Sequence, residues 1–149
     1  NHPKDPGGET NLGVTKRVYQ EHGGTKDMKD LLVEDVAPIY KKGYWDKIKG
    51  DDLPGGLDLC VFDFGVNAGP GRAAKFLQQM IGTTVDGGIG PNTLAKVEEY
   101  VRENGEHETV KKYQEMRQKY YEQLSTFATF GRGWTRRVEE TTKLALDII

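Results

Sequence analysis

The chain has 149 residues, of which 36% are hydrophobic, so it can bury the core of a compact domain and is too apolar to be intrinsically disordered. Its 21 basic and 23 acidic residues give a formal net charge of -2, which argues against a general nucleic-acid-binding protein. No apolar run approaches the roughly 18 residues of a membrane-spanning helix, no signal peptide is visible, and the single cysteine, Cys60, excludes a disulfide within the chain.

The N-terminal third predicts two short helices separated by turns, over residues 14–21 and 33–45. A small β-hairpin near residues 10–25 is the one strand arrangement that the pattern allows. Pro38 either kinks the second helix or marks its true start, because proline has no N–H to donate and its ring clashes with the preceding turn. A polar loop is expected over 46–56.

The rest of the chain predicts a series of amphipathic helices, so the expected fold class is mostly α. The clearest helix covers 57–68, where apolar residues recur at spacings of four and three on one face. The other helices are expected at 70–80, from Pro91 onward, at 107–130, and from Trp134 to about Ile148 after a break at the GRG of 131–133. A change of composition near 81–86 divides the chain into halves, 1–80 and 81–149, with the second packed on the first.

The spacing of reactive residues excludes most catalytic chemistries. The histidines, His2, His22 and His107, lie far apart without zinc-ligand spacing, so no metal site is expected. The only serine, Ser125, lacks the G-x-S-x-G context of a nucleophile, and no P-loop is present, so no cofactor is expected either. Cys60 lies in an apolar run and is predicted to be a small buried side chain.

Carboxylates and aromatic residues remain as candidates. Asp5 stands before a Pro-Gly-Gly turn and Thr10 follows it, a pair that can position a water as a general base does, or simply cap the turn.

Asp63 lies inside an apolar helix, where it needs hydrogen bonds. The favoured interpretation is that Asp63 and Asn67 hold the next loop, with direct catalysis as the alternative. The aromatic candidates, which could stack on pyranose rings or pack in the core, are Tyr40, Tyr44 and Trp45.

Three stretches resemble a known family. NHPKDPGGETNLGVT at 1–15 resembles the motif E-G-G-Y-x-N-x-P-x-D-P-G-G-x-T-x-x-G-[IV]-[TS] of the glycoside hydrolase family 108 lysozymes. The likeness continues through IYKKGYWDKIKGDDLPGGLDLCVFDFGVNAGPGRAAKFLQ at 39–78. VDGGIGPNTL at 85–94 resembles the D-G-x-x-G-P-x-T signature of the predicted peptidoglycan-binding half that follows in this family. Asp86 in this turn is equally well explained as a cap.

The resemblance implies a lysozyme-like helical fold with two packed lobes, and cleavage of the β-1,4 bond between N-acetylmuramic acid and N-acetylglucosamine. It implies that Asp5 and Thr10 flank the attacking water. The residues then expected to contact substrate are Asn11, Gly13, Tyr40, Tyr44, Trp45, Asp63 and Asn67. The family's general acid is a Glu that falls five residues before Asn1, so the 149 residues alone are expected to lack the group that protonates the leaving oxygen.

The implied partner is bacterial peptidoglycan, and we expect a monomer without stable membrane insertion. The implied role is that of a phage endolysin, made in the host cytoplasm and acting on the cell wall or periplasm, although the family also contains bacterial secretion-activator muramidases. The alternatives are a non-catalytic peptidoglycan-binding or virion-structural protein and, less favoured, a lytic transglycosylase. Seven basic residues could attract an anionic wall or form a solvated helix face: Lys111, Lys112, Arg117, Lys119, Arg132, Arg136 and Arg137.

Overall fold

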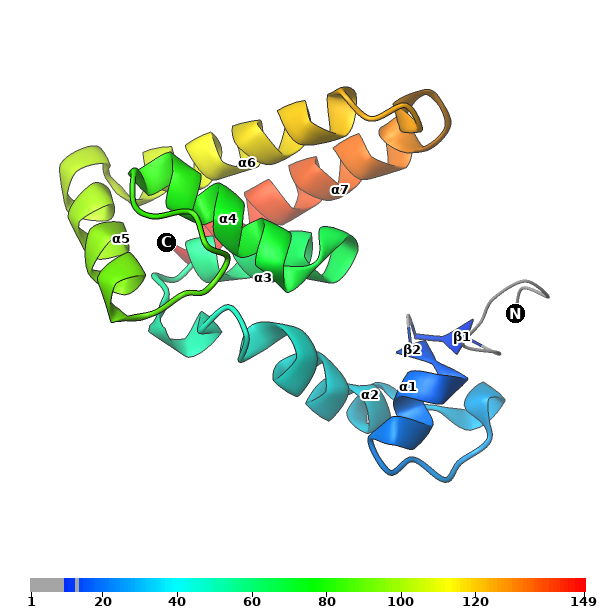
Figure 1. Cartoon of the computed structure of the whole chain (residues 1–149). Coiled ribbons are helices and arrows are strands. Elements are labelled where there is room, and N and C mark those ends of the chain that lie inside the picture. The colour runs from blue at the N-terminus through cyan, green and yellow to red at the C-terminus, as the bar shows by residue number, and fades with distance from the viewer. Residues whose placement is uncertain (1–9, 13) are drawn as a thin grey trace. The chain divides into compact units, whose positions relative to one another are not determined.

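The computed structural model describes residues 10–12 and 14–149, and it divides into two compact units, Asn1–Gly43 and Tyr44–Ile149 (Figure 1). Its described residues form seven α-helices, one two-stranded hairpin and short 3-10 and π-helical turns. None of the helices found in these ranges has the length and apolarity that a bilayer-crossing segment needs. The mostly α fold predicted from the sequence is confirmed.

The first unit begins with the antiparallel strands β1 (Thr10–Asn11) and β2 (Val14–Thr15), in a register that pairs Thr10 with Thr15. The hairpin allowed by the sequence is therefore present. Helix α1 (Lys16–Glu21) starts two residues later than expected, because Val14 and Thr15 extend to pair with β1. Thr15 then caps the helix, since its hydroxyl accepts a hydrogen bond from the backbone N–H of Val18 at 3.3 Å.

A 3-10 turn (Met28–Asp30) and helix α2 (Val33–Tyr40) complete this unit. Pro38 lies inside α2 and does not mark its start, because Asp35 caps the helix by accepting from Leu32 N–H at 2.8 Å. Past Tyr40 the backbone changes to a π-helical turn (Lys41–Trp45). The buried side chains of the unit gather in one small core: Val14, Tyr19, Met28, Leu31, Val36 and Ile39.

The second unit is a bundle of five helices after a 3-10 turn at Gly50–Asp52. They are α3 (Leu57–Ala68), α4 (Pro70–Ile81), α5 (Pro91–Asn104), α6 (Glu106–Glu122) and α7 (Phe127–Ile148). Helix α3 packs against α4, α6 and α7, while α6 and α7 lie side by side as a helical hairpin (Figure 1). The predicted halves 1–80 and 81–149 do not coincide with the two units, because α3 and α4 share one core with α5–α7.

The predicted helix over 107–130 and the break at 131–133 are wrong. Helix α6 ends at Glu122, and α7 begins at Phe127 and runs straight through the GRG. Gly131 is buried there, and a Cβ on it would come within 2.7 Å of the Phe127 ring. Helix α7 also packs along α6, and this tertiary packing outweighs the low helix propensity of glycine.

The turn between α4 and α5 is held by Gln78, a fully buried residue of α4. Its carbonyl oxygen accepts from the N–H groups of Asp86 and Gly87 at 3.0 and 2.9 Å. Its amide nitrogen donates to the Asp86 carboxylate, the Gly88 carbonyl and the Thr93 hydroxyl. Asp86 also accepts from Gly88 N–H, so it caps the turn, and these hydrogen bonds hold the pKa of its carboxyl below the usual range.

Replacement of Gln78 by methionine should destabilise the chain by about 3 kcal/mol, because it keeps the side-chain volume but removes five hydrogen bonds, one to the buried Thr93 hydroxyl and four to the turn of residues 86–88. Urea denaturation would measure the free energy of unfolding. The adjacent exposed residue gives the control: Gln79→Met should change the value by less than about 0.5 kcal/mol. Equal stability of the two variants would contradict the role assigned to Gln78.

Candidate functional site

Of the two residues predicted to position water, Asp5 and Thr10, the structure describes only part of one. Asp5 and Gly13 lie outside the described residues, and of Thr10 the structure describes the backbone in strand β1. Their catalytic and binding roles therefore stay predictions.

Two side-chain hydrogen bonds connect the hairpin that carries Thr10 to the rest of the first unit. The side-chain amide of Asn11 donates to the Met28 carbonyl at 2.7 Å. The hydroxyl of Tyr40 donates to the carbonyl of Leu12 at 2.8 Å, and Leu12 adopts a left-handed conformation with a φ of 53°. Two predicted substrate-binding residues, Asn11 and Tyr40, thus fix the position of the turn next to Thr10.

The other two aromatic candidates, Tyr44 and Trp45, are half-buried residues of the second unit. The indole N–H of Trp45 donates to Asp51 at 2.9 Å, and its ring meets the Phe62 ring edge-on at 5.5 Å. The same ring lies against Gly50, where a Cβ would come within 2.3 Å. Trp45 is therefore held in place by packing, and sugar stacking by either residue stays a prediction.

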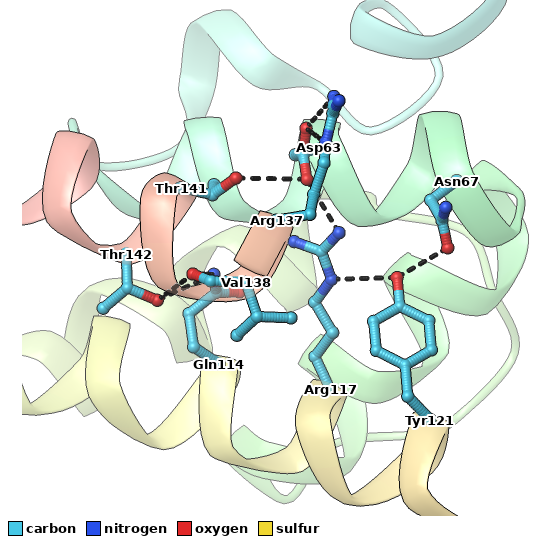
Figure 2. A network of polar contacts seen from close by, with 9 residues as sticks. All are labelled: Asp63, Asn67, Gln114, Arg117, Tyr121, Arg137, Val138, Thr141 and Thr142. Atoms are coloured by element: carbon cyan, nitrogen blue, oxygen red, sulfur yellow. Dashed lines mark hydrogen bonds and ion pairs between the residues drawn. The ribbon is translucent and has the colours of Figure 1, made fainter. Parts of the chain in front are cut away.

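Asp63 stands at the centre of an ion cluster in the second unit (Figure 2). Its side chain is only 9% exposed. One carboxylate oxygen accepts from Nη2 of Arg117 at 2.7 Å and from the Thr141 hydroxyl at 3.2 Å. The other accepts from Nε and Nη2 of Arg137 at 2.9 and 2.5 Å. One carboxylate of α3 therefore binds α6 and α7 together.

The charge state of Asp63 follows from its partners. Burial by itself raises the pKa of a carboxyl group. The hydrogen bonds and positive charges of Arg137 and Arg117 outweigh burial and hold the pKa of Asp63 below its usual range. Asp63 is therefore ionised at neutral pH.

Asn67, one turn further along α3, belongs to the same network. Its carbonyl oxygen accepts from the Tyr121 hydroxyl at 2.6 Å, and that hydroxyl accepts from Nε of Arg117 at 3.1 Å (Figure 2). The favoured interpretation, that Asp63 and Asn67 hold the following loop, is wrong because both reach across to neighbouring helices. Asn67 itself is exposed, and substrate contact by either residue stays a prediction.

Arg117 is not the surface cation that the sequence predicts. Its side chain is fully buried, with its guanidinium against the Phe64 and Tyr121 rings. Its spacing of four from Tyr113 and Tyr121 was the available signal, because all three then share the inner face of α6. Because Arg117 is buried, the seven cations do not form one basic face, and two of the others, Lys119 and Lys111, pair with Glu115 and Glu108.

No further reactive group stands out among the described residues. They contain no cluster of three or more side chains suited to holding a metal ion. Cys60 is fully buried, and burial raises the pKa of its thiol to about 12, so it is inert as a nucleophile.

Comparison with known proteins defines the class of this protein. Residues 1–69 match the model of the family described as glycosyl hydrolase 108, and residues 72–139 match that of the predicted peptidoglycan domain. SagA of Brucella abortus has a solved structure with 39% sequence identity and a TM-score of 0.81, over 99% of this chain and 85% of that one. Curated proteins gave no match.

The chain therefore belongs to the glycosyl hydrolase 108 family and joins its hydrolase region to a peptidoglycan domain. Its fold is lysozyme-like, as the sequence resemblance implied. Its class is that of a glycosidase acting on peptidoglycan.

Asp63→Asn should lower the free energy of unfolding at pH 7 by about 3 kcal/mol, because it leaves the buried Arg117 without a compensating charge. Chemical denaturation would measure this difference. Asp147→Asn, at an exposed site on α7, is the matched control and should have an effect below about 0.5 kcal/mol. A loss equal to that of the control would show that the ion cluster contributes nothing to stability.

The same variant should change the response to acid. Because the folded-state pKa of Asp63 lies below the unfolded value of about 3.9, its stabilisation is complete above that pH and is lost as pH falls through the folded pKa. The wild-type chain should therefore lose stability below about pH 4 more steeply than Asp63→Asn. Parallel pH profiles of the two would contradict this assignment.

Proposed function

We propose that this protein is an N-acetylmuramidase that cleaves the β-1,4 bond between N-acetylmuramic acid and N-acetylglucosamine in bacterial peptidoglycan. In this proposal Asp5 and Thr10 position the attacking water. The general acid is the Glu that the family resemblance places five residues before Asn1. A general acid and a carboxylate that positions water are the two groups that glycoside hydrolysis requires.

The observation that carries the proposal is the anchored hairpin within the matched hydrolase region. A water-positioning pair needs a fixed backbone, because small displacements of a catalytic group cost large factors in rate. The hydrogen bonds of Asn11 to Met28 and of Tyr40 to Leu12 supply such fixation next to Thr10. Their positions favour a structural role for Asn11 and Tyr40 in aligning the catalytic turn.

We infer a phage endolysin made in the cytoplasm of the host bacterium and acting on its wall, consistent with the family resemblance. Expression of the full-length gene in a bacterium should then cause lysis once the inner membrane is made permeable to the protein. Viability unchanged under that treatment would argue against the endolysin role.

Asp5→Asn in the full-length gene product should lower the rate of peptidoglycan cleavage by roughly 10²–10⁴-fold, because the water loses its positioning carboxylate. Purified peptidoglycan would be digested and the released ends identified by mass spectrometry. Reducing N-acetylmuramic acid ends from the wild type are expected.

Asp30→Asn is the control, an exposed acid in the same unit that should leave the rate unchanged. Normal activity in a folded Asp5→Asn variant would end the assignment to Asp5. Anhydromuramic ends would instead identify a lytic transglycosylase. No release of fragments by the full-length product, with binding retained, would identify a non-catalytic wall-binding protein.

A further inference from the structure

Four residues on one flank of α7 form a surface that the hydrolase assignment leaves unused. They are Phe130, Gly133, Trp134 and Arg137, spaced as i, i+3, i+4 and i+7 and so adjacent on the helix, and we call them the α7 patch. Phe130 is 53% exposed and the Arg137 side chain 57% exposed, while Trp134 is half-buried. All four lie within the region that matches the peptidoglycan domain.

The aromatic part of the α7 patch is held rigidly. The Trp134 ring stacks on Tyr121 at 5.1 Å with an interplanar angle of 27°, and Phe130 lies over Trp134 at 5.6 Å and 31°. Tyr121 is fixed in turn by its hydrogen bonds to Arg117 and Asn67 (Figure 2). An aromatic surface fixed in this way loses little conformational entropy when a ligand binds.

Gly133 leaves the helix backbone uncovered within the α7 patch, and packing does not explain why a glycine stands there. Glycine is the poorest helix former apart from proline. Gly131 is explained by the Phe127 ring, but a Cβ on Gly133 would meet no atom within 4 Å. Close approach of a ligand to the backbone is the other recognised reason for glycine in such a place.

The polar end of the α7 patch opens into a small pocket. Arg137 is shared between the patch and this pocket, whose volume is about 250 Å³ and whose walls also include Leu59, Asp63, Glu140 and Leu144. Apolar walls with one guanidinium and two carboxylates suit an uncharged amide group, which can both donate and accept hydrogen bonds. Amide groups occur on the N-acetyl and stem-peptide substituents of a peptidoglycan strand.

We propose that the α7 patch binds the glycan strand of peptidoglycan, with a sugar ring seated over Gly133 against Phe130 and a substituent directed to Arg137. The apolar C–H face of a pyranose ring matches the aromatic surface, and an amide carbonyl of the strand matches the Arg137 guanidinium, which binds Asp63 and yet belongs to a side chain that is 57% exposed. This inference shares its substrate class with the proposed function but needs no cleavage.

The first test places a side chain at Gly133. Gly133→Gln should raise the denaturation midpoint, since glutamine is a better helix former, and yet lower the affinity for purified insoluble peptidoglycan about fivefold. Phe130→Ala should weaken binding to a similar extent. Ile148→Ala removes a similarly exposed apolar side chain, 60% exposed, at the end of the same helix but outside the α7 patch, and should bind like wild type.

The second test locates the contact. The chain has two tryptophans, so their indole N–H signals in an NMR spectrum can be assigned with Trp134→Phe. Titration with the β-1,4-linked tetramer of N-acetylglucosamine should shift the Trp134 signal. Wild-type binding by Gly133→Gln and Phe130→Ala, or an unmoved Trp134 signal, would overturn the proposal.

The two proposals can fail separately. Patch-dependent binding without any release of reducing ends would refute the muramidase and leave the α7 patch standing. Cleavage with binding that is indifferent to Gly133 and Phe130 would refute the α7 patch alone.

Discussion

The packing of α3, α6 and α7 in the second unit depends on one buried carboxylate, that of Asp63. Asp63 projects from α3 into the space between α6 and α7, where an unpaired charge would be strongly unfavourable. Two guanidinium groups and a hydroxyl satisfy both of its oxygens, and each of these partners comes from α6 or α7. The three helices must therefore meet in one register, because any slip would leave buried charges without partners.

This constraint reaches beyond the ion cluster. Arg117 bonds to the Tyr121 hydroxyl, Tyr121 bonds to Asn67, and the Tyr121 ring supports Trp134. The exposed aromatic surface on α7 is thus held in place by a chain of contacts that leads back to the buried carboxylate of α3. A pre-organised surface binds more tightly than a mobile one of the same composition, because less freedom is lost on binding.

The cluster also joins the two regions that the family models recognise. Asp63 and Asn67 lie within the part matched to glycosyl hydrolase 108, and Arg117, Tyr121 and Arg137 lie within the peptidoglycan domain. Inside Tyr44–Ile149 these two parts share one hydrophobic core and one polar network. The second unit is therefore a single packed body, and a change on α6 or α7 acts on the hydrolase-region helix α3.

The sequence by itself determined the fold class, the helices α3 to α5, the hairpin as an allowed element and the family. These follow from local signals: apolar periodicity, glycine and proline at the ends of helices, and long motif strings. The roles of Asp5 and Thr10 rest on the resemblance alone. Only the tertiary structure decided that α7 runs through its glycines, that Arg117 is buried, and that Asp63 and Asn67 bond to distant helices. Each of these depends on a partner at least 54 residues away or on a packed neighbouring helix, and local periodicity, which can place Arg117 on the inner face of α6, does not identify the partner that it meets there.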